Sequence, residues 1–139
     1  MKYKELTLDW DYYMISNITE NKENILKLIK ICCNNIKVLD TKKGLNLIGD
    51  LKKDIDFNEL IILRLFCFDD IFRIRNEITK AHQKQLHRVN RIWLSKDGIE
   101  KETIFNNSSD NLTIGILDNF ILRINSKRPL SNSKKEIVQ

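Results

Sequence analysis

The chain has 139 residues, of which 42% are hydrophobic and 31% are charged, and its formal net charge is +5 at pH 7. These values are typical of a single globular domain and exclude an intrinsically disordered chain. The sequence has no apolar run of about eighteen residues, so we expect no membrane-spanning helix and a soluble, cytoplasmic protein.

The first part of the chain has apolar residues at helical spacing, and only one proline and four glycines interrupt the whole sequence. A first helix is expected over about residues 1–17, and a second over about 21–39. Two lysines and a glycine at 42–44 form a C-terminal stop signal, after which we expect a shorter helix over about 45–55. The apolar positions that support the first helix are Leu6, Trp10, Tyr13, Met14 and Ile18.

The longest predicted element begins after Asp56. This residue is a suitable N-cap, and Glu59 three positions later completes a capping box. The helical pattern then continues almost unbroken, which predicts one long central helix over residues 57–95, ended by the Lys-Asp-Gly sequence at 96–98. A helix of this length is unusual in a small domain, and a break near residues 69–70 is the alternative.

Two interpretations fit the region after residue 100. The Asn/Ser/Asp cluster at 106–111 predicts a loop, followed by a last helix on the apolar residues of 112–124. The alternative is a small β-hairpin near 103–116. From Pro129 onward the sequence is polar, as is typical of a loose tail.

These elements together predict an all-α fold, a bundle of four to five helices with one long central helix. The helical domain is expected over residues 1–128 and the polar tail over 129–139. The sequence shows no internal repeat that would divide the domain.

The three cysteines, Cys32, Cys33 and Cys67, are odd in number, and two of them are adjacent. This spacing suits neither a disulfide framework nor a zinc site, in which ligands come as spaced pairs. Each cysteine stands among Ile, Leu or Phe, so we expect buried thiols in a reduced protein. No glycine-rich phosphate loop is present either, and we expect no metal and no cofactor.

The net charge is concentrated in one segment. Residues 1–72 carry eleven Lys or Arg against twelve Asp or Glu, and residues 92–139 carry seven against six. Residues 73–91 carry six against one, so this segment holds the excess of positive charge. Such a local asymmetry indicates a polyanionic partner, for which RNA or another nucleic acid is the first candidate.

On a helical wheel, the basic residues of this segment gather opposite an apolar stripe. The stripe consists of Ile71, Ile74, Ile78, Ala81, Val89, Ile92 and Trp93. The basic face is either solvated, or it contacts the phosphates of a nucleic acid, with each cation adding salt-dependent affinity. The candidate nucleic-acid-binding residues are Arg73, Lys80, Lys84, His87, Arg88 and Arg91.

Arg75 and His82 lie inside or at the edge of the apolar stripe instead. They are seven residues apart, so on a helix they stand nearly above one another, about 10 Å apart along the axis. A polar side chain on an apolar face needs a hydrogen-bond partner, a cleft or an interface. The pair is therefore either a core histidine beside an arginine that reaches solvent, or two parts of one ligand site.

Arg75 and Asn76, followed after five residues by His82, resemble the Arg-x4–6-His motif of HEPN domains, helical bundles many of which are metal-independent RNases of defence or toxin systems. The resemblance implies that His82 is the general base or acid, because histidine titrates near neutral pH. Arg75 would stabilise charge on the phosphate and Asn76 would orient one of the two. It also implies a site shared across a homodimer. His87, on the opposite face, would only bind RNA.

The sequence leaves three functions open. The protein is a HEPN-like endoribonuclease, a non-catalytic nucleic-acid-binding adaptor or small subunit of a nucleoprotein complex, or a protein-interaction module such as an inhibitor or antitoxin. The adaptor would bind nucleic acid without cutting it. The interaction module would bind a protein partner through the apolar stripe and would bind no nucleic acid.

Overall fold

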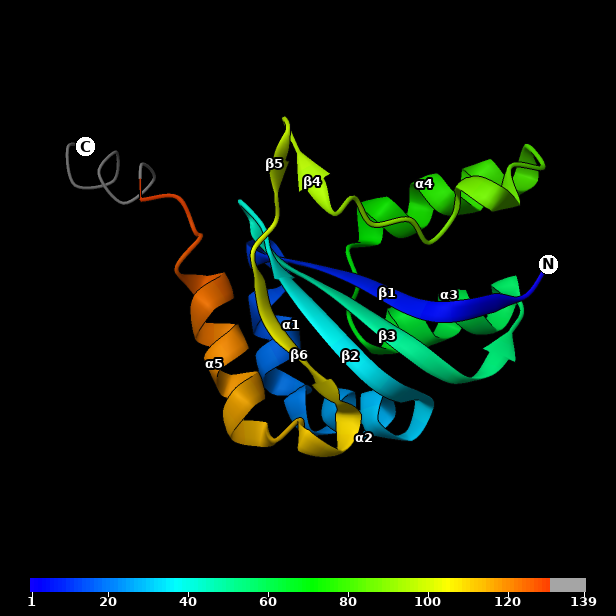
Figure 1. Ribbon diagram of the computed structural model, residues 1–139. Helices are drawn as coiled ribbons and strands as arrows, with labels where there is room; N and C mark the ends of the chain where they lie inside the picture. Colours follow the sequence, from blue (N-terminus) through cyan, green and yellow to red (C-terminus); the bar gives the residue numbers. More distant parts are fainter. Residues whose placement is uncertain (131–139) are drawn as a thin grey trace.

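A four-stranded antiparallel sheet lies at the centre of the structure, a computed structural model that describes residues 1–130 (Figure 1). Its strand order is β1-β3-β2-β6, and a separate two-stranded hairpin is formed by β4 and β5. The fold is therefore α+β, and the predicted all-α bundle is wrong. The strands are β1 (Tyr3–Asp11), β2 (Cys33–Asp40), β3 (Gly44–Ile55), β4 (Ser95–Lys96), β5 (Ile99–Glu100) and β6 (Thr103–Ser108).

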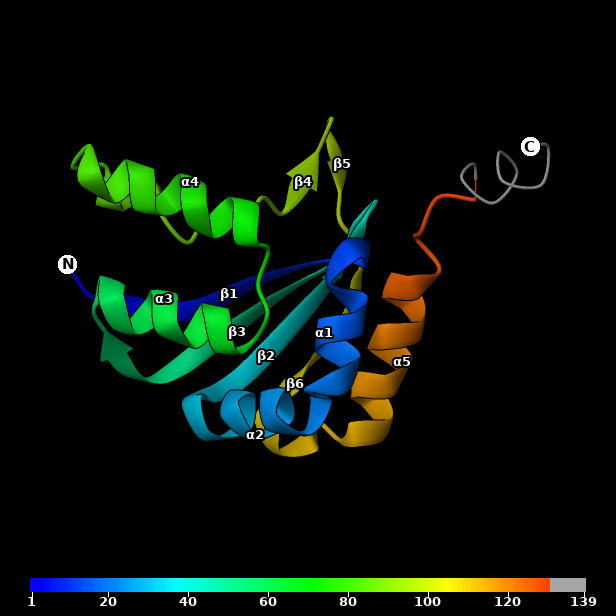
Figure 2. The ribbon, with the colours of Figure 1, turned by 180° about the vertical axis from the view of Figure 1, so that it is seen from behind.

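Four of the five α-helices cover one face of the sheet, which is the back face in Figure 1 and faces the viewer in Figure 2. The fifth, α4, lies beside the β1 edge of the sheet rather than over its face. Short 3-10 turns occur at Tyr12–Met14, Leu86–Arg88 and Ser109–Asn111. The helices are α1 (Ile15–Glu20), α2 (Lys22–Cys32), α3 (Phe57–Phe66), α4 (Ile71–His82) and α5 (Ile114–Asn125).

The predicted first helix is the edge strand β1. Leu6, Leu8 and Trp10 are completely buried, while Thr7 and Asp9 between them point to the opposite face. This alternation is the period-two pattern of a strand. Leu6 and Trp10 are four residues apart, a spacing that fits one face of a helix and one face of a strand equally well, so the helical interpretation was wrong.

The predicted helix over 21–39 is only partly present, and the predicted helix over 45–55 is wrong, because this range is part of β3. The first helix ends at Cys32, and the rest of both segments forms the β2–β3 hairpin. The predicted stop at 42–44 is correct as a boundary, but it is the turn of this hairpin. Gly44 pairs with Asp11 of β1, and a Cβ at Gly44 would lie 1.7 Å from the carbonyl oxygen of Trp10. Only glycine allows the two strands to come this close.

The capping box at the start of α3 is confirmed. The Glu59 N–H donates to Asp56 Oδ1 at 2.8 Å, and the Asp56 N–H donates to Glu59 Oε1 at 3.2 Å. The single long helix is wrong, and the alternative of a break near 69–70 is correct. Phe68 has a positive φ of 56°, and the Asp70 side chain caps the next helix, α4.

The continuation of the long helix to residue 95 is also wrong. The helix α4 ends at His82, and Lys84 has a positive φ of 59°, which a right-handed helix excludes. The chain then turns back along α4, and Val89 is 4% exposed in the core. The helical wheel does not apply after His82, because that segment does not share the axis of α4; Val89 is nevertheless buried, as its place in the apolar stripe predicts.

The last helix predicted over 112–124 is confirmed as α5. The alternative hairpin near 103–116 is wrong, because β6 pairs with β2, far away in the sequence. Phe105 of β6 packs edge-on against Phe120 of α5, which joins this strand to the helical layer. The expected tail falls largely on residues 131–139, outside the described residues.

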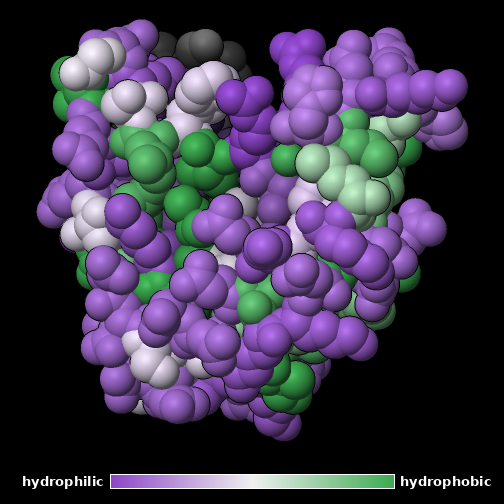
Figure 3. Space-filling model, turned by 45° about the vertical axis from the view of Figure 1, so that its right-hand side comes forward, coloured by the Kyte–Doolittle hydropathy of each residue, from purple (hydrophilic) through white to green (hydrophobic). Residues whose placement is uncertain are grey.

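The hydrophobic core lies between the sheet and the four helices behind it. The opposite face, which we call the front face, carries polar side chains such as Asp9 and Asn46. Seen from the side in Figure 3, the surface is mostly hydrophilic and is interrupted by separate hydrophobic patches. Within residues 1–130, no helix has the length and apolar character needed to cross a membrane.

Candidate functional site

Buried charges hold α4 against the rest of the molecule. Arg64 of α3 is completely buried, and its Nε donates to Asp69 Oδ2 at 2.7 Å. The guanidinium also forms an ion pair with Glu77 of α4, which is 3% exposed. Burial raises the pKa of Asp69, while the guanidinium groups of Arg73 and Arg64 act in the opposite direction. Arg64 thus fixes both the start and the middle of α4.

Arg73 extends this network to the sheet. Its Nη1 donates to Asp69 Oδ2 at 3.0 Å and to the carbonyl oxygen of Thr7 at 3.1 Å. Its Nη2 donates to the Thr7 hydroxyl and, at 3.4 Å, to the carbonyl oxygen of Arg91. Because these partners use its donors, Arg73 mainly joins α4 to β1 and to the segment after α4.

The segment over 83–94 is held on β1 by one asparagine with a positive φ of 66°. The Asn90 N–H donates to Glu77 Oε1 at 2.6 Å, and Asn90 Nδ2 donates to the carbonyl oxygen of Glu5 at 2.7 Å. The Thr7 hydroxyl also contacts the Asn90 side chain. These contacts hold the backbone at Asn90 in place. They therefore determine the direction in which the side chains on either side of Asn90 point.

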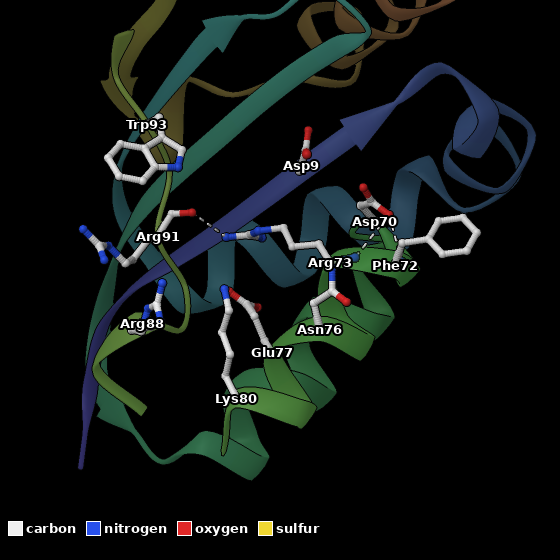
Figure 4. Close-up of a pocket in the computed structure, with 10 residues that line it drawn as sticks. All are labelled: Asp9, Asp70, Phe72, Arg73, Asn76, Glu77, Lys80, Arg88, Arg91 and Trp93. Atoms are coloured by element: carbon white, nitrogen blue, oxygen red, sulfur yellow. Dashed lines mark hydrogen bonds between the residues drawn. The ribbon is translucent and has the colours of Figure 1, made fainter. Parts of the chain in front are cut away.

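A groove lies between α4 and this segment (Figure 4). Side chains at spacings of three and four leave one side of α4 and point toward the segment that carries Arg88, Arg91 and Trp93. The cavity has a volume of about 320 Å³. We call it the basic groove, and its lining is Asp9, Asp70, Phe72, Arg73, Asn76, Glu77, Lys80, Arg88, Arg91 and Trp93.

Three cations of the basic groove have no acidic partner. Among the described residues, no carboxylate forms an ion pair with Lys80, Arg88 or Arg91. Two of the three acids in the lining are engaged: Glu77 contacts Arg64 and Asn90, and Asp70 caps α4 and accepts from the Tyr13 hydroxyl. The third, Asp9, accepts a hydrogen bond from Asn46 through Oδ1 and forms no ion pair with the three cations. The groove therefore offers unneutralised positive charge to a ligand.

Four of the six predicted nucleic-acid-binding residues line the basic groove, namely Arg73, Lys80, Arg88 and Arg91. The other two do not. Lys84 is exposed in the turn after α4, and His87 lines a neighbouring cavity of about 450 Å³. The groove residues come from two elements that approach each other in space, so their proximity does not depend on a single helical face.

Five residues that line the basic groove are not among the predicted site residues, namely Asp9, Asp70, Phe72, Glu77 and Trp93. Trp93 is the one whose aromatic ring lies beside a predicted cation. Its side chain is 69% exposed, and the guanidinium carbon of Arg91 lies 5.2 Å from the centroid of its ring. The expected long helix placed Trp93 in the buried apolar stripe. The available signal is an arginine and an aromatic residue two positions apart at 91 and 93, since cations and aromatic rings together bind single-stranded nucleic acid.

The three predicted catalytic residues lie on the exposed part of α4. Arg75 and Asn76 line a shallow pocket of about 490 Å³ together with Phe72. His82 is the last residue of α4 and lines neither that pocket nor the basic groove. The structure thus brings two of the three residues to one pocket and leaves the histidine outside its lining.

The cysteines occupy the core rather than the groove. Cys33 and Cys67 are completely buried and Cys32 is half-buried, and all three are free thiols. Burial raises the pKa of the Cys33 thiol to about 12, which makes it a poor nucleophile at neutral pH. Among the described residues, no three His, Cys, Asp or Glu side chains are grouped as metal ligands would be.

The basic groove is therefore the strongest candidate site: it combines unpaired cations with an exposed indole on a rigid support. Searches with this chain against family models, curated proteins and solved structures found no match.

Proposed function

We propose that the protein binds single-stranded nucleic acid in the basic groove. Phosphates contact Lys80, Arg88 and Arg91, and a base stacks on Trp93. The observation that carries the proposal is the convergence of three unpaired cations beside an indole that is 69% exposed. Arg88, Arg91 and Trp93 are exposed residues of the segment that Asn90 fixes, and Lys80 leaves α4 beside them. None of these four residues belongs to the hydrophobic core, so the fold does not need them there.

The combination of cations and an aromatic ring favours nucleic acid over other anions. Cations alone would suit any polyanion, since they release counterions from phosphates or carboxylates alike. An exposed aromatic ring adds a stacking surface worth about 1–3 kcal/mol per base. Bases are free to stack on a side chain only when they are outside a duplex, so the preferred ligand is a single strand.

The test is fluorescence anisotropy with a labelled RNA of about twelve nucleotides and with DNA of the same sequence, across a series of salt concentrations. Each phosphate contact contributes about −0.7 to the slope of log affinity against log salt for single strands. Three contacts predict a slope of about −2, and Arg88→Ala or Lys80→Ala should each reduce its magnitude by about 0.7.

The matched control is Lys27→Ala. Lys27 is an exposed lysine of α2, on the opposite side of the sheet, so its loss removes the same charge without touching the groove. The control should bind like the wild type. A wild type that does not bind either strand at low salt would contradict the proposal, as would equal losses in the groove variants and the control.

A second candidate is an adaptor that binds nucleic acid and a protein together. Its support is a set of exposed apolar side chains on α3, Ile62, Leu65 and Phe66, which are 53%, 44% and 63% exposed. Their spacing of three and four places them on one side of the helix. Protein contacts through α3 and nucleic-acid contacts through the groove would use separate surfaces. Leu65→Asp and Phe66→Asp should then leave nucleic-acid affinity intact.

A further inference from the structure

The basic groove opens into a second, larger cavity. Asp9, Arg73, Arg91 and Trp93 line both. The second cavity has a volume of about 770 Å³ and lies between the front face of the sheet and the β4–β5 hairpin, so we call it the hairpin cavity. Volumes of about 300–1,000 Å³ are usual for pockets that hold small organic ligands.

One wall of the hairpin cavity is apolar. It consists of Ile92, Trp93 and Ile99, of which Trp93 and Ile99 are 69% and 73% exposed. Flat, apolar surfaces of this kind suit the face of a planar heterocycle, which loses water on contact with them. Trp93 thus stands where the phosphate-binding groove meets a cavity large enough for a base.

The sheet contributes a polar wall whose groups are held in fixed positions. Asn46 is 2% exposed; its Nδ2 donates to Asp9 Oδ1 at 3.0 Å, and Lys101 Nζ donates to its Oδ1 at 2.9 Å. Both ends of the Asn46 amide are therefore satisfied. The hydrogen bond from Asn46 Nδ2 to Oδ1 holds the Asp9 carboxylate in place. The other oxygen, Asp9 Oδ2, has no hydrogen-bond partner among the described residues.

Asp9 is surrounded by charges of both signs. Burial and the neighbouring carboxylates, of which Asp69 is the strongest, raise its pKa to about 6, while Arg73 acts in the opposite direction. At pH 7.5 the carboxylate is therefore mostly ionised, and Oδ2 can only accept a hydrogen bond. Asp9 lines the hairpin cavity, and a fixed acceptor there without a partner among the described residues favours a ligand that brings a donor.

We propose that the hairpin cavity takes one base of the strand held in the basic groove, that the base stacks on Trp93, and that Asp9 Oδ2 accepts a hydrogen bond from its amino group. This inference rests on the proposed function. It makes the protein selective for bases with an exocyclic amino group over uracil. Cytosine and uracil provide the sharpest comparison, because the N4 amino donor of cytosine corresponds to the O4 acceptor of uracil.

The experiment compares the affinities of oligo(C) and oligo(U) RNA of equal length at pH 7.5. The wild type should bind oligo(C) about tenfold more tightly, in keeping with a directed contact to the base edge. Asp9→Asn keeps an oxygen for Asn46 and replaces the free acceptor with a donor, so the preference should be lost or reversed. Asp54→Asn, which removes the same charge from an exposed position on β3, should retain the preference.

A second measurement does not alter the protein. Replacing cytidine by pyrimidin-2-one riboside removes the N4 amino group without adding bulk, and should weaken wild-type binding about tenfold. Equal affinity for all three oligonucleotides would overturn base selection by Asp9 while leaving nucleic-acid binding intact. Failure of all three to bind would instead overturn the proposed function, together with this inference.

Discussion

The guanidinium of Arg91 lies over the ring of Trp93, with its central carbon 5.2 Å from the ring centroid. A planar cation on one face of an indole leaves the opposite face free for a base. The pair therefore combines a charge for a phosphate with a stacking surface for the adjacent nucleoside. This arrangement leads to the first prediction.

Trp93→Ala should weaken binding of single-stranded RNA about tenfold or more, because stacking of one base is worth about 1–3 kcal/mol. Trp93→Phe should retain part of the affinity.

The same binding has an optical readout, because the chain has two tryptophans. Trp10 is completely buried, and its Nε1 donates to the Cys67 carbonyl at 2.9 Å. RNA should therefore quench the Trp93 emission alone. Quenching that persists in Trp93→Phe would place the ligand elsewhere.

The endoribonuclease hypothesis leads to a separate assay, in which RNA is incubated with the protein in EDTA. We expect RNA to bind and to remain intact, because His82 does not line the groove that holds the three unpaired cations. The helical bundle that the HEPN resemblance implied is also not the fold. Cleavage that is lost in His82→Ala and Arg75→Ala, but kept in His87→Ala, would contradict this expectation and support the catalytic hypothesis.

The sequence predicted features that depend on residues close together in the chain. The capping box of Asp56 and Glu59 needs only four consecutive positions and is correct. The strand β1 was missed because Leu6 and Trp10 fit both periods, and the choice between them depends on β3, some forty residues away. Whether a segment forms an edge or a central strand depends more on such distant partners than on its intrinsic β-propensity.

The prediction of the site from the sequence is limited in the same way. The local excess of positive charge predicts a binding site within residues 73–91, but it does not distinguish Arg73 from Arg88. Arg73 donates to Thr7 and Asp69, whereas Arg88 forms no ion pair with a carboxylate within residues 1–130. That difference depends on which side of α4 faces β1. No sequence pattern within residues 73–91 indicates which side that is.

The buried network of Arg64 provides a stability prediction. Arg64→Leu leaves the carboxylates of Asp69 and Glu77 buried without this partner, so it should lower the free energy of unfolding by about 3–5 kcal/mol. Arg123→Leu is the control, since the Arg123 side chain is 43% exposed and its pair with Asp40 should contribute less than about 1 kcal/mol. Urea unfolding measures both. Similar midpoints for the two variants would show that the network does not hold α4.

The pH dependence of stability follows from Asp9. Its pKa is raised from 3.8 to about 6 in the folded protein, so between these values the folded state binds more protons than the unfolded state. Stability contributed by this group is therefore present below about pH 4 and is lost as the pH rises to about 6. The loss is on the order of 3 kcal/mol.

Asp9→Asn removes this contribution, so the variant should gain stability relative to the wild type as the pH rises from 4 to 7. Urea unfolding at several pH values measures the difference. Asp69 is the strongest of the carboxylates that act on Asp9, so the difference between the two proteins reports the coupled pair and not Asp9 alone. A difference that does not change with pH would mean that Asp9 is not buried as the structure has it.

The last prediction concerns the contact that brings the edge strand into the sheet. A Cβ at Gly44 would lie 1.7 Å from the backbone oxygen of Trp10, and backbone atoms cannot move aside as a flexible side chain can. Gly44→Ala should therefore separate β1 from β3 at this end and destabilise the protein by several kcal/mol, the scale of a strained core substitution.

Gly115→Ala is the matched control. The nearest neighbour of its added Cβ would be Thr113 Oγ1 at 3.8 Å, and alanine is favoured within α5. Thermal unfolding should show a large drop for the first variant and no loss for the second. Because β1 also carries Thr7 and Asp9, the Gly44→Ala protein should lose nucleic-acid binding as it unfolds, at the same temperature as its sheet signal in circular dichroism.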